Sequence, residues 1–296
     1  MYLEFYKLNR NPFHITPDPA FLFLTASHQE AAASISYGVA ERKGFIAITG
    51  EVGVGKTTVL RSYLQGLDPA KNKVIYIFNT ALSFEQLLKQ ICLELGIEFY
   101  REDAQELVNR IFWSLVRDYK EQLNVLLIID EAQNMPVDTL ERLRMLSNLE
   151  TSEDKLVQII MVGQPEFDAK LKLPELRQLN QRIAVRARIE PLSPEESRAY
   201  IAHRMMKASS FFRPLFTEDA MDAIVSRARG IPRVINILSD NALITGFGYQ
   251  RNPVGRDIVE EVICDLSGEK RKKPSLWKRL LLFLRHGTNG KGKLSL

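Results

Sequence analysis

The chain has 296 residues, of which 45% are hydrophobic and 26% charged, so its composition is that of an ordinary globular protein and excludes collagen-like and disordered classes. This length suits one large domain or two modest ones. No apolar run approaches the ~20 residues of a membrane-spanning helix, and the N-terminus lacks the pattern of a secretory signal. Two cysteines are too few for a disulfide scaffold, and the histidines lack metal-ligand spacing, so we expect no zinc site.

Charge is unevenly distributed along the chain. The formal net charge is +4, but residues 270–296 contain nine Lys or Arg and no acid, which leaves −5 for residues 1–269. A mildly acidic body disfavours extensive contact with a phosphate backbone. We therefore expect an anionic partner to meet the basic tail.

The first 26 residues are rich in proline and aromatic side chains, which prevents a long helix and predicts an arm lying against a domain. A helix is expected over residues 27–42. Short apolar runs then alternate with helical segments near residues 83–95, 103–122 and 136–150, a pattern that predicts parallel strands in a three-layer α/β sandwich. The expected strands are Gly44–Gly50, Lys73–Asn79, Asn124–Ile129, Leu156–Val162 and Ile183–Ile189.

From Ser193 onward the pattern contains helices only. Ser193 and Thr217 precede acidic residues and are expected N-caps. The expected helices are Pro194–Ala208, Thr217–Arg229, Arg233–Gly246 and Gly255–Leu266. The expected division is an arm at 1–26, an α/β subdomain at 27–192, a helical subdomain at 193–267 and a tail at 268–296.

The strongest motif is a glycine-rich loop of the form G-x-x-x-x-G-K-[ST], placed between a predicted strand and a predicted helix. Glycines let backbone N–H groups converge on a phosphate, and the helix N-terminus adds partial positive charge. Lys56 can reach the β- and γ-phosphates, and the Thr57 hydroxyl can bind Mg²⁺. The predicted nucleotide-binding residues are Gly50, Glu51, Val52, Gly53, Val54, Gly55, Lys56, Thr57 and Thr58.

A second motif follows the expected strand 124–129, which ends in Asp130 and Glu131. Ligands of open α/β sheets bind at this carboxyl edge. Asp130 is predicted to hold Mg²⁺ with Thr57, and Glu131 to act as the general base that activates water. Alone, a strand end with two acids is a weak signal; the phosphate loop earlier in the chain strengthens it.

Several segments resemble the AAA+ ATPases, and more closely the ExeA/GspA-type secretion ATPases and the related pilus-biogenesis ATPases. The resemblance covers roughly residues 1–267 and rests on NPFHITPDPAFLFLTASHQEA, GFIAITGEVGVGKTT, LLIIDEAQNM, IIMVGQPE, LRQLNQRI and GIPRVIN. It implies that the helical segment is an AAA+ lid. Longer members continue into a membrane span and a wall-binding domain, neither of which we expect in this chain.

The resemblance also implies roles for individual residues. Gln164 matches the polar sensor of the γ-phosphate, although Asn or Thr is more usual there. Arg182 matches the region that supplies an arginine finger to a neighbour's ATP, with Arg177 as the alternative. Arg233 matches a lid sensor of the phosphates. The arm around Pro12 and Phe13 matches a segment near the adenine, and plain packing against the core is the other interpretation.

The tail has its own pattern. As a helix, residues 275–286 would place Leu276, Trp277 and most other apolar side chains on one face and the basic ones on the other. Such a helix suits an anionic membrane surface. Docking on a protein and disorder are the alternatives.

Together these features favour an ATP- and Mg²⁺-dependent ATPase that assembles into a homo-oligomer through arginine fingers. We expect it to drive a secretion, pilus or polysaccharide-export system in the cytoplasm, with peripheral attachment to the membrane as an option. A DNA-binding ATPase of the transposition-helper type is the alternative, and the acidic body makes nucleic acid the less favoured partner.

Overall fold

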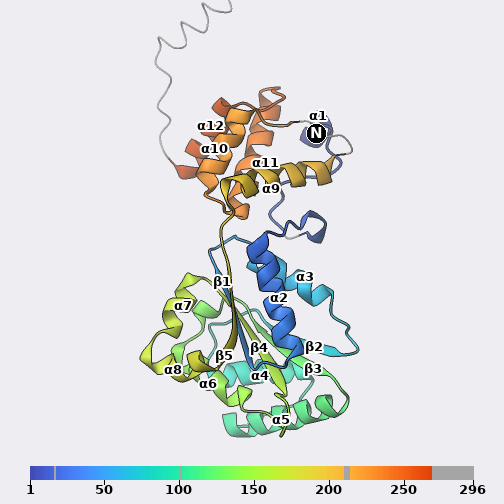
Figure 1. Ribbon diagram of the computed structural model, residues 1–296, viewed down its shortest axis with the longest axis vertical. Coiled ribbons are helices and arrows are strands. Elements are labelled where there is room, and N and C mark those ends of the chain that lie inside the picture. Colours follow the sequence, from blue (N-terminus) through green and yellow to red (C-terminus); the bar gives the residue numbers. More distant parts are fainter. Residues whose placement is uncertain (17, 101, 210–213, 269–296) are drawn as a thin grey trace, which may run out of the picture.

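A computed structural model of the chain describes residues 1–16, 18–100, 102–209 and 214–268. These residues form a lower α/β lobe and an upper helical lobe, joined at a waist (Figure 1). The amphipathic helix expected at 275–286 lies outside the described residues. Within the described part of the chain, no helix is long and apolar enough to cross a membrane.

The α/β lobe is built on a sheet of five parallel strands in the order β2-β3-β4-β1-β5. The strands are β1 (Phe45–Gly50), β2 (Asn72–Ile77), β3 (Asn124–Ile129), β4 (Val157–Gly163) and β5 (Ile183–Ile189). The register pairs Ile48 of β1 with Val162 of β4 and Ala187 of β5. The predicted five-stranded parallel sheet is confirmed. Because all strands run the same way, the segments after β1, β3 and β4 meet at one edge of the sheet.

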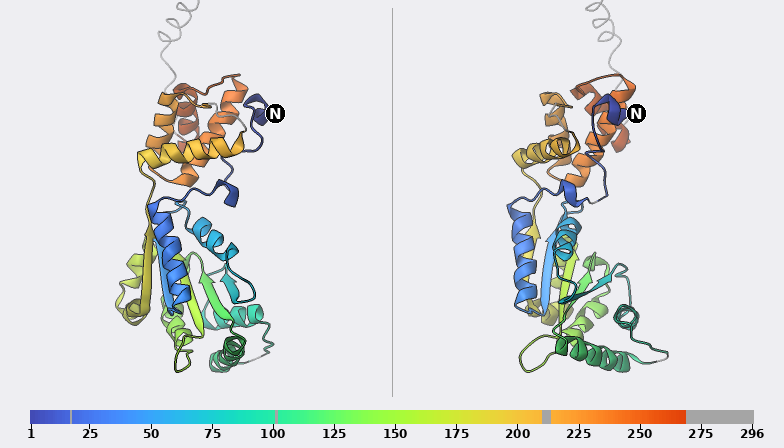
Figure 2. Two further views of the ribbon diagram at one scale, coloured as in Figure 1. Left: turned by 45° about the vertical axis from the view of Figure 1, so that its right-hand side comes forward. Right: turned by 90° about the vertical axis from the view of Figure 1, so that its right-hand side faces the viewer.

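Helices cover both faces of the sheet (Figure 2). One face carries α2 (Ala26–Ala40) and α3 (Lys56–Gln65). The other carries α4 (Phe84–Leu95), α5 (Ala104–Lys120), α6 (Val137–Ser147), α7 (Pro165–Leu171) and α8 (Arg177–Arg182). This arrangement is the predicted three-layer sandwich.

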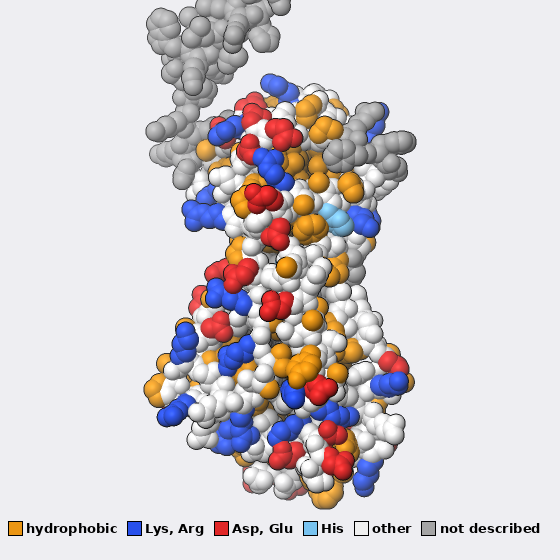
Figure 3. All heavy atoms as spheres, viewed as in Figure 1, with side chains coloured by type: hydrophobic (Ala, Val, Ile, Leu, Met, Phe, Trp, Pro, Cys, Tyr) orange, Lys and Arg blue, Asp and Glu red, His pale blue; other side chains and the backbone are white. Residues whose placement is uncertain are grey.

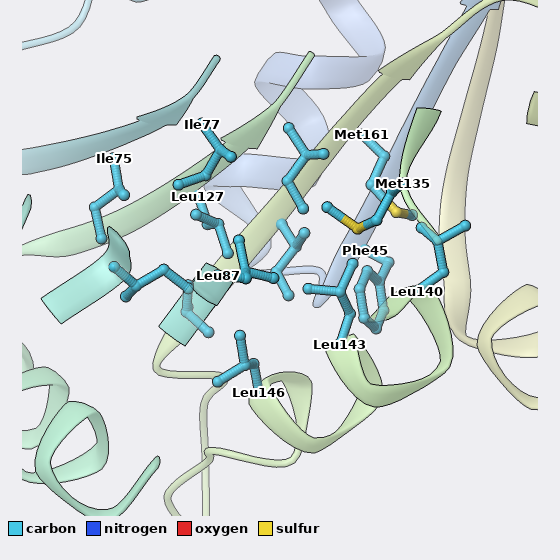
Figure 4. Packing of buried hydrophobic residues seen from close by; sticks show 14 of the residues in the cluster. Phe45, Ile75, Ile77, Leu87, Leu127, Met135, Leu140, Leu143, Leu146 and Met161 are labelled. Carbon is cyan, nitrogen blue, oxygen red and sulfur yellow. The ribbon is translucent and has the colours of Figure 1, made fainter. Parts of the chain in front are cut away.

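Alternation along the strands divides the apolar side chains between the two helical layers. Ile46 and Ile48 of β1 pack with α2 and α3, whereas Phe45 and Ala47 pack into the larger cluster beneath α4–α8. Figure 4 shows Phe45 and Leu127 pointing from their strands toward the helices of that cluster. Each buried Ile, Leu or Val contributes roughly 1.5–3 kcal/mol to folding, so the sheet is a rigid support for the polar segments at its edge.

Two short helices, α7 and α8, were not predicted. They have seven and six residues, too few for a helical period to stand out in the sequence. α7 begins directly after Gln164, with Pro165 at its first position. The two helices fill the connection between β4 and β5 and so place Gln164 and Arg182.

The helical lobe contains α9 (Pro194–Ala208), α10 (Glu218–Ala228), α11 (Pro232–Gly248) and α12 (Arg256–Ser267). Ser193 closes a capping box with Glu196 at the start of α9. Thr217 stands at the N-cap of α10, but its side chain accepts no backbone N–H of the helix and its hydroxyl donates to the Asp219 carboxylate.

The N-terminal arm packs on the helical lobe and not on the sheet. It contains a short helix, α1 (Tyr2–Phe5), and a 3₁₀ turn, η1 (Pro19–Phe21). Phe13 and Phe21 are buried in the core of the helical lobe, and the Tyr2 hydroxyl donates to Asp240 of α11 at 3.0 Å. From there the chain crosses the waist to reach α2, so the arm connects the two lobes.

Candidate active site

A cavity of about 480 Å³ lies between the two lobes. It is placed at the waist that Figure 3 shows between the upper and lower halves of the surface. Its walls come from three parts of the chain that are far apart in sequence: the arm (His14 to Phe23), the glycine-rich loop with the start of α3, and the helical lobe (Tyr200, Arg204, Arg233 and Asn236). Glu131 contributes from the sheet edge.

The glycine-rich loop between β1 and α3 needs glycine at two positions. Gly53 and Gly55 have φ values of 82° and 109°, in the region that disfavours side chains. A Cβ on Gly53 would lie 2.7 Å from Cβ of Arg233, and one on Gly55 would lie 3.1 Å from Nε2 of His28. Arg233 and His28 therefore pack closely against the two glycines, and residues 52–58 line the cavity together with them.

Lys56 is the first residue of α3, where the N–H groups of the first turn have no helical partner. Its ammonium donates to the carbonyls of Gly50 at 2.8 Å and Glu51 at 2.9 Å. Burial lowers the pKa of Lys56, and the nearby carboxylates of Glu131 and Asp130 oppose that shift. A cation and free N–H groups at one point make a site for phosphate.

Asp130, directly after β3, joins the loop to the sheet edge. Its Oδ2 accepts from the Thr57 hydroxyl at 3.1 Å and from the Tyr76 hydroxyl at 2.8 Å. Its Oδ1 accepts from the backbone N–H of Glu131 at 2.9 Å. Burial, together with the Asp130 charge, raises the pKa of Tyr76, so this hydroxyl stays protonated and donates. The Thr57 hydroxyl and the Asp130 carboxylate provide the hard oxygen ligands that Mg²⁺ prefers.

Glu131 has a left-handed backbone, with φ 54° and ψ 43°. Its Oε2 accepts from the side-chain amides of Gln133 at 2.5 Å and Gln164 at 2.8 Å. The amide oxygen of Gln133 in turn accepts from the backbone N–H of Gln164 at 3.0 Å. Non-glycine residues in this conformation cluster at functional sites, and here three hydrogen bonds fix the side chain and its neighbours.

The turn that carries Glu131 and Gln133 is also fastened from both sides. The Thr80 hydroxyl, just after β2, donates to the Glu131 carbonyl at 3.1 Å. The Lys170 ammonium of α7 donates to the carbonyls of Gln133 at 2.8 Å and Met135 at 2.6 Å. Burial lowers the pKa of Lys170. The segment after β2 and helix α7 after β4 therefore hold the Asp130–Met135 turn from its two sides.

Most of the residues predicted from the sequence meet here. Arg233 lines the cavity, and its backbone N–H donates to Gly53 at 3.3 Å. Arg182 does not line it: this side chain is exposed at the end of α8 and donates to Ser147 and Asn148. Arg177, at the start of the same helix, is also exposed.

The arm reaches the cavity with other side chains than those expected. Phe13 is fully buried against Phe216, with ring centroids 6.1 Å apart, and does not line the cavity. Phe21 and Phe23 do. The Phe21 ring lies 4.7 Å from the Arg204 guanidinium of the helical lobe, which also holds the Pro12 carbonyl.

Sequence reasoning missed Tyr76, Thr80 and Gln133. The available signal for Tyr76 was a hydroxyl between two isoleucines in the apolar part of its strand. Gln133 lies two residues after Glu131, in the motif in which only Asp130 and Glu131 were predicted to be functional. Their contacts depend on strand order, which brings β2 and β4 to either side of β3.

The fold and this loop define a P-loop NTPase of the AAA class. A family described as "AAA domain" matches residues 39–171. General secretion pathway protein A of Aeromonas hydrophila is 37% identical over 273 residues, which are 90% of this chain and 49% of that protein. The chain is accordingly an ExeA/GspA-like member of the AAA ATPases, as its motifs predicted. It spans about half the length of this curated relative.

Solved structures share the fold at low sequence identity. Cdc6p from Pyrobaculum aerophilum has a TM-score of 0.64 at 18% identity, over 95% of this chain and 90% of that one. The Aeropyrum pernix ORC2 protein, solved as ADPNP–ADP complexes, has a TM-score of 0.63 at 16% identity, over 86% of this chain and 72% of that one. These likenesses concern the fold alone.

Proposed function

We propose that the chain binds ATP in the cavity between its lobes and hydrolyses it, with Thr57 and Asp130 as Mg²⁺ ligands and Glu131 as general base. The observation that carries this proposal is the continuous line of contacts from Thr57 through Asp130 to Glu131, beside the buried ammonium of Lys56. The residues that bind phosphate, the metal ligands and the general base thus come from the turns after β1 and β3, which lie at one edge of the sheet.

In this proposal the N–H groups of loop 50–58 and the start of α3 hold the phosphates. Lys56 exchanges its two loop carbonyls for phosphate oxygens, which are charged and therefore stronger acceptors. Arg233 adds a second cation from the helical lobe, so phosphate binding draws that lobe against the loop. The aromatic side chains of the arm supply the apolar wall that an adenine needs.

Glu131 then activates the attacking water. Both amides donate to its Oε2, so we assign Oε1 to accept the proton of that water. Gln133 and Gln164 hold the carboxylate in place, and because Gln164 directly follows β4 at the same sheet edge it can report on the γ-phosphate. Bound Mg²⁺ would withdraw charge from the β- and γ-phosphate oxygens.

We also propose that activity needs a second subunit. Arg182 is exposed on α8 and away from the cavity of its own chain, a position suited to serving a neighbour's site. Its guanidinium would stabilise charge on the transferring phosphoryl group. Because the relative's name concerns secretion, we propose that the assembled ATPase works on a secretion, pilus or export system, and that the basic tail attaches it peripherally to an anionic membrane.

The direct test measures ADP affinity and ATP turnover of the full chain, with and without Mg²⁺. Lys56→Ala should weaken ADP binding about tenfold or more, because charged hydrogen bonds to phosphate are lost. Lys89→Ala is the matched control, since Lys89 pairs with Glu85 on the surface of α4 and does not line the cavity. Equal ADP affinity of the Lys56 variant and wild type would refute the proposed phosphate site.

A further inference from the structure

A buried histidine, His28, packs against the phosphate loop at the wall of the cavity. Nε2 of His28 lies 2.9 Å from the carbonyl oxygen of Val54, inside the loop. Nδ1 of the same ring lies 2.7 Å from the hydroxyl of Thr25. His28 is 5% exposed, and Gly55 leaves room for the ring, because a Cβ there would lie 3.1 Å from Nε2. None of the proposed ATPase roles uses this side chain.

The contact matters because of the way a phosphate loop is built. Its N–H groups must point toward the anion, so its carbonyls must turn away from it and find partners inside the protein. The carbonyls of Gly50 and Glu51 accept from Lys56, whose ammonium is lost to them when it moves to a phosphate. The carbonyl of Val54 instead accepts from His28, which does not move to bind phosphate and so keeps this contact.

The partners also fix the protonation of the ring. A carbonyl can only accept, so Nε2 carries the proton, and Nδ1 accepts from the Thr25 hydroxyl. Burial lowers the pKa of His28, and the contact with Val54 and the charge of Glu196 oppose that shift. The neutral ring with its proton on Nε2 satisfies both contacts.

The Thr25 hydroxyl contacts the His28 ring and does not cap its own helix. Thr25 is the N-cap residue of α2, yet its side chain caps no backbone N–H of that helix. The hydroxyl contacts His28 and, at 3.2 Å, Ser27, which in turn accepts from the backbone N–H of Glu190 after β5. The Thr25–His28 pair therefore lies where the arm, the phosphate loop and the connection to the helical lobe meet.

We propose that His28 is a positioning residue of the ATP site, which holds the Val54 carbonyl turned away from the phosphates and so keeps the loop N–H groups directed at them. The inference rests on the proposed ATP binding. It predicts that what the site requires of residue 28 is one N–H donor at the position of Nε2.

Two amide variants test whether residue 28 must donate an N–H to Val54 or need only fill the space of the ring. His28→Gln carries its amide at the distance of Nε2 and can donate to Val54, whereas His28→Asn carries it at the level of Nδ1 and cannot. We expect ADP affinity within about threefold of wild type for His28→Gln and about tenfold weaker for His28→Asn, as for loss of a buried hydrogen bond. Isothermal titration with ADP measures both, and thermal unfolding shows whether each variant folds.

A second pair tests the Thr25 contact. Thr25→Ser keeps the hydroxyl and should bind ADP like wild type, whereas Thr25→Val removes it and should bind several-fold more weakly. In ¹⁵N-histidine NMR of the wild-type chain, assigned with His28→Gln, the ring should be neutral with its proton on Nε2. This spectrum decides the matter even if His28→Asn fails to fold.

These experiments distinguish failure of the His28 role from failure of the proposed ATP site. A wild-type chain that does not bind ADP refutes the ATP site itself. A wild-type chain that binds ADP, with His28→Asn binding equally well or with the His28 proton on Nδ1, overturns the positioning role and leaves the ATP site standing.

Discussion

The turns that follow β1 and β3 lie at the same edge of the sheet but are stabilised in different ways. The first is shaped by glycine backbone at Gly53 and Gly55 and by the ammonium of Lys56. The second is shaped by side chains from the segments that follow β2 and β4, which bind Glu131 and Gln133 from both sides. Functional residues that lie together in the sequence can be predicted from it, whereas those brought together from different parts of the sheet are found only in the structure.

The largest expected effect comes from a residue that neither turn contacts. An arginine finger is worth about 10³–10⁵ in rate, so Arg182→Ala should nearly abolish turnover while ADP affinity stays unchanged. Turnover should also rise with protein concentration. Mixing Arg182→Ala with Lys56→Ala should restore part of the activity, because one supplies an intact site and the other the finger. Absence of rescue, with a monomeric ATP-bound chain, would contradict the shared site.

The glycine-shaped turn should fail when its backbone is restricted. Gly53→Ala places a Cβ 2.7 Å from Cβ of Arg233 at a φ of 82°, with a strain of about 1–3 kcal/mol. We expect ADP affinity to fall about tenfold or more. Gly248→Ala is the matched control, since its added Cβ meets nothing within 4 Å. Similar ADP affinities for the two variants would remove the distinction between the turns.

The side-chain-built turn should fail differently. Gln133→Leu removes the donor to Glu131 and the acceptor for Gln164. We expect kcat to fall about tenfold with little change in ADP affinity, because the base is displaced and the phosphate grip is not. Asn134→Leu, at the exposed neighbouring position, should leave kcat unchanged. A lower ADP affinity with normal kcat would assign Gln133 to binding.

The difference between the turns also explains what could be predicted. The five strands and the ATPase family follow from apolar runs and motifs, since buried parallel strands and a glycine-rich loop leave local signatures. The partners Tyr76 and Thr80 leave no specific one, because each contacts the turn from β2 or the segment after it, and Gln133 is linked to Gln164 only through the fold. Phe13 shows the same limit: its sequence neighbourhood resembles an adenine-binding segment, but its ring is buried in the helical lobe and does not line the cavity.

The smallest expected effect is on stability. Burial lowers the pKa of His28 below its ordinary 6.5 in the folded chain. The unfolded chain then binds more protons as pH falls through 6.5, so this stability is complete above 6.5 and is lost on acidification. Each pH unit costs at most about 1.4 kcal/mol for one histidine. Urea unfolding at pH 7 and 5.5 should show a shallower loss for His28→Gln than for wild type; an equal loss would mean that His28 titrates alike in both states.

The most direct test of the two-turn site is Glu131→Gln, which keeps the shape of the side chain and removes its basicity. General bases typically contribute 10²–10⁴ in rate, so single-turnover ATP hydrolysis should slow by about that factor while ATP and ADP affinities stay within about threefold of wild type. Rapid-quench assays with equilibrium titration measure both quantities. Hydrolysis at the wild-type rate would contradict the assignment of the base, and with it the claim that the turns after β1 and β3 form one catalytic site.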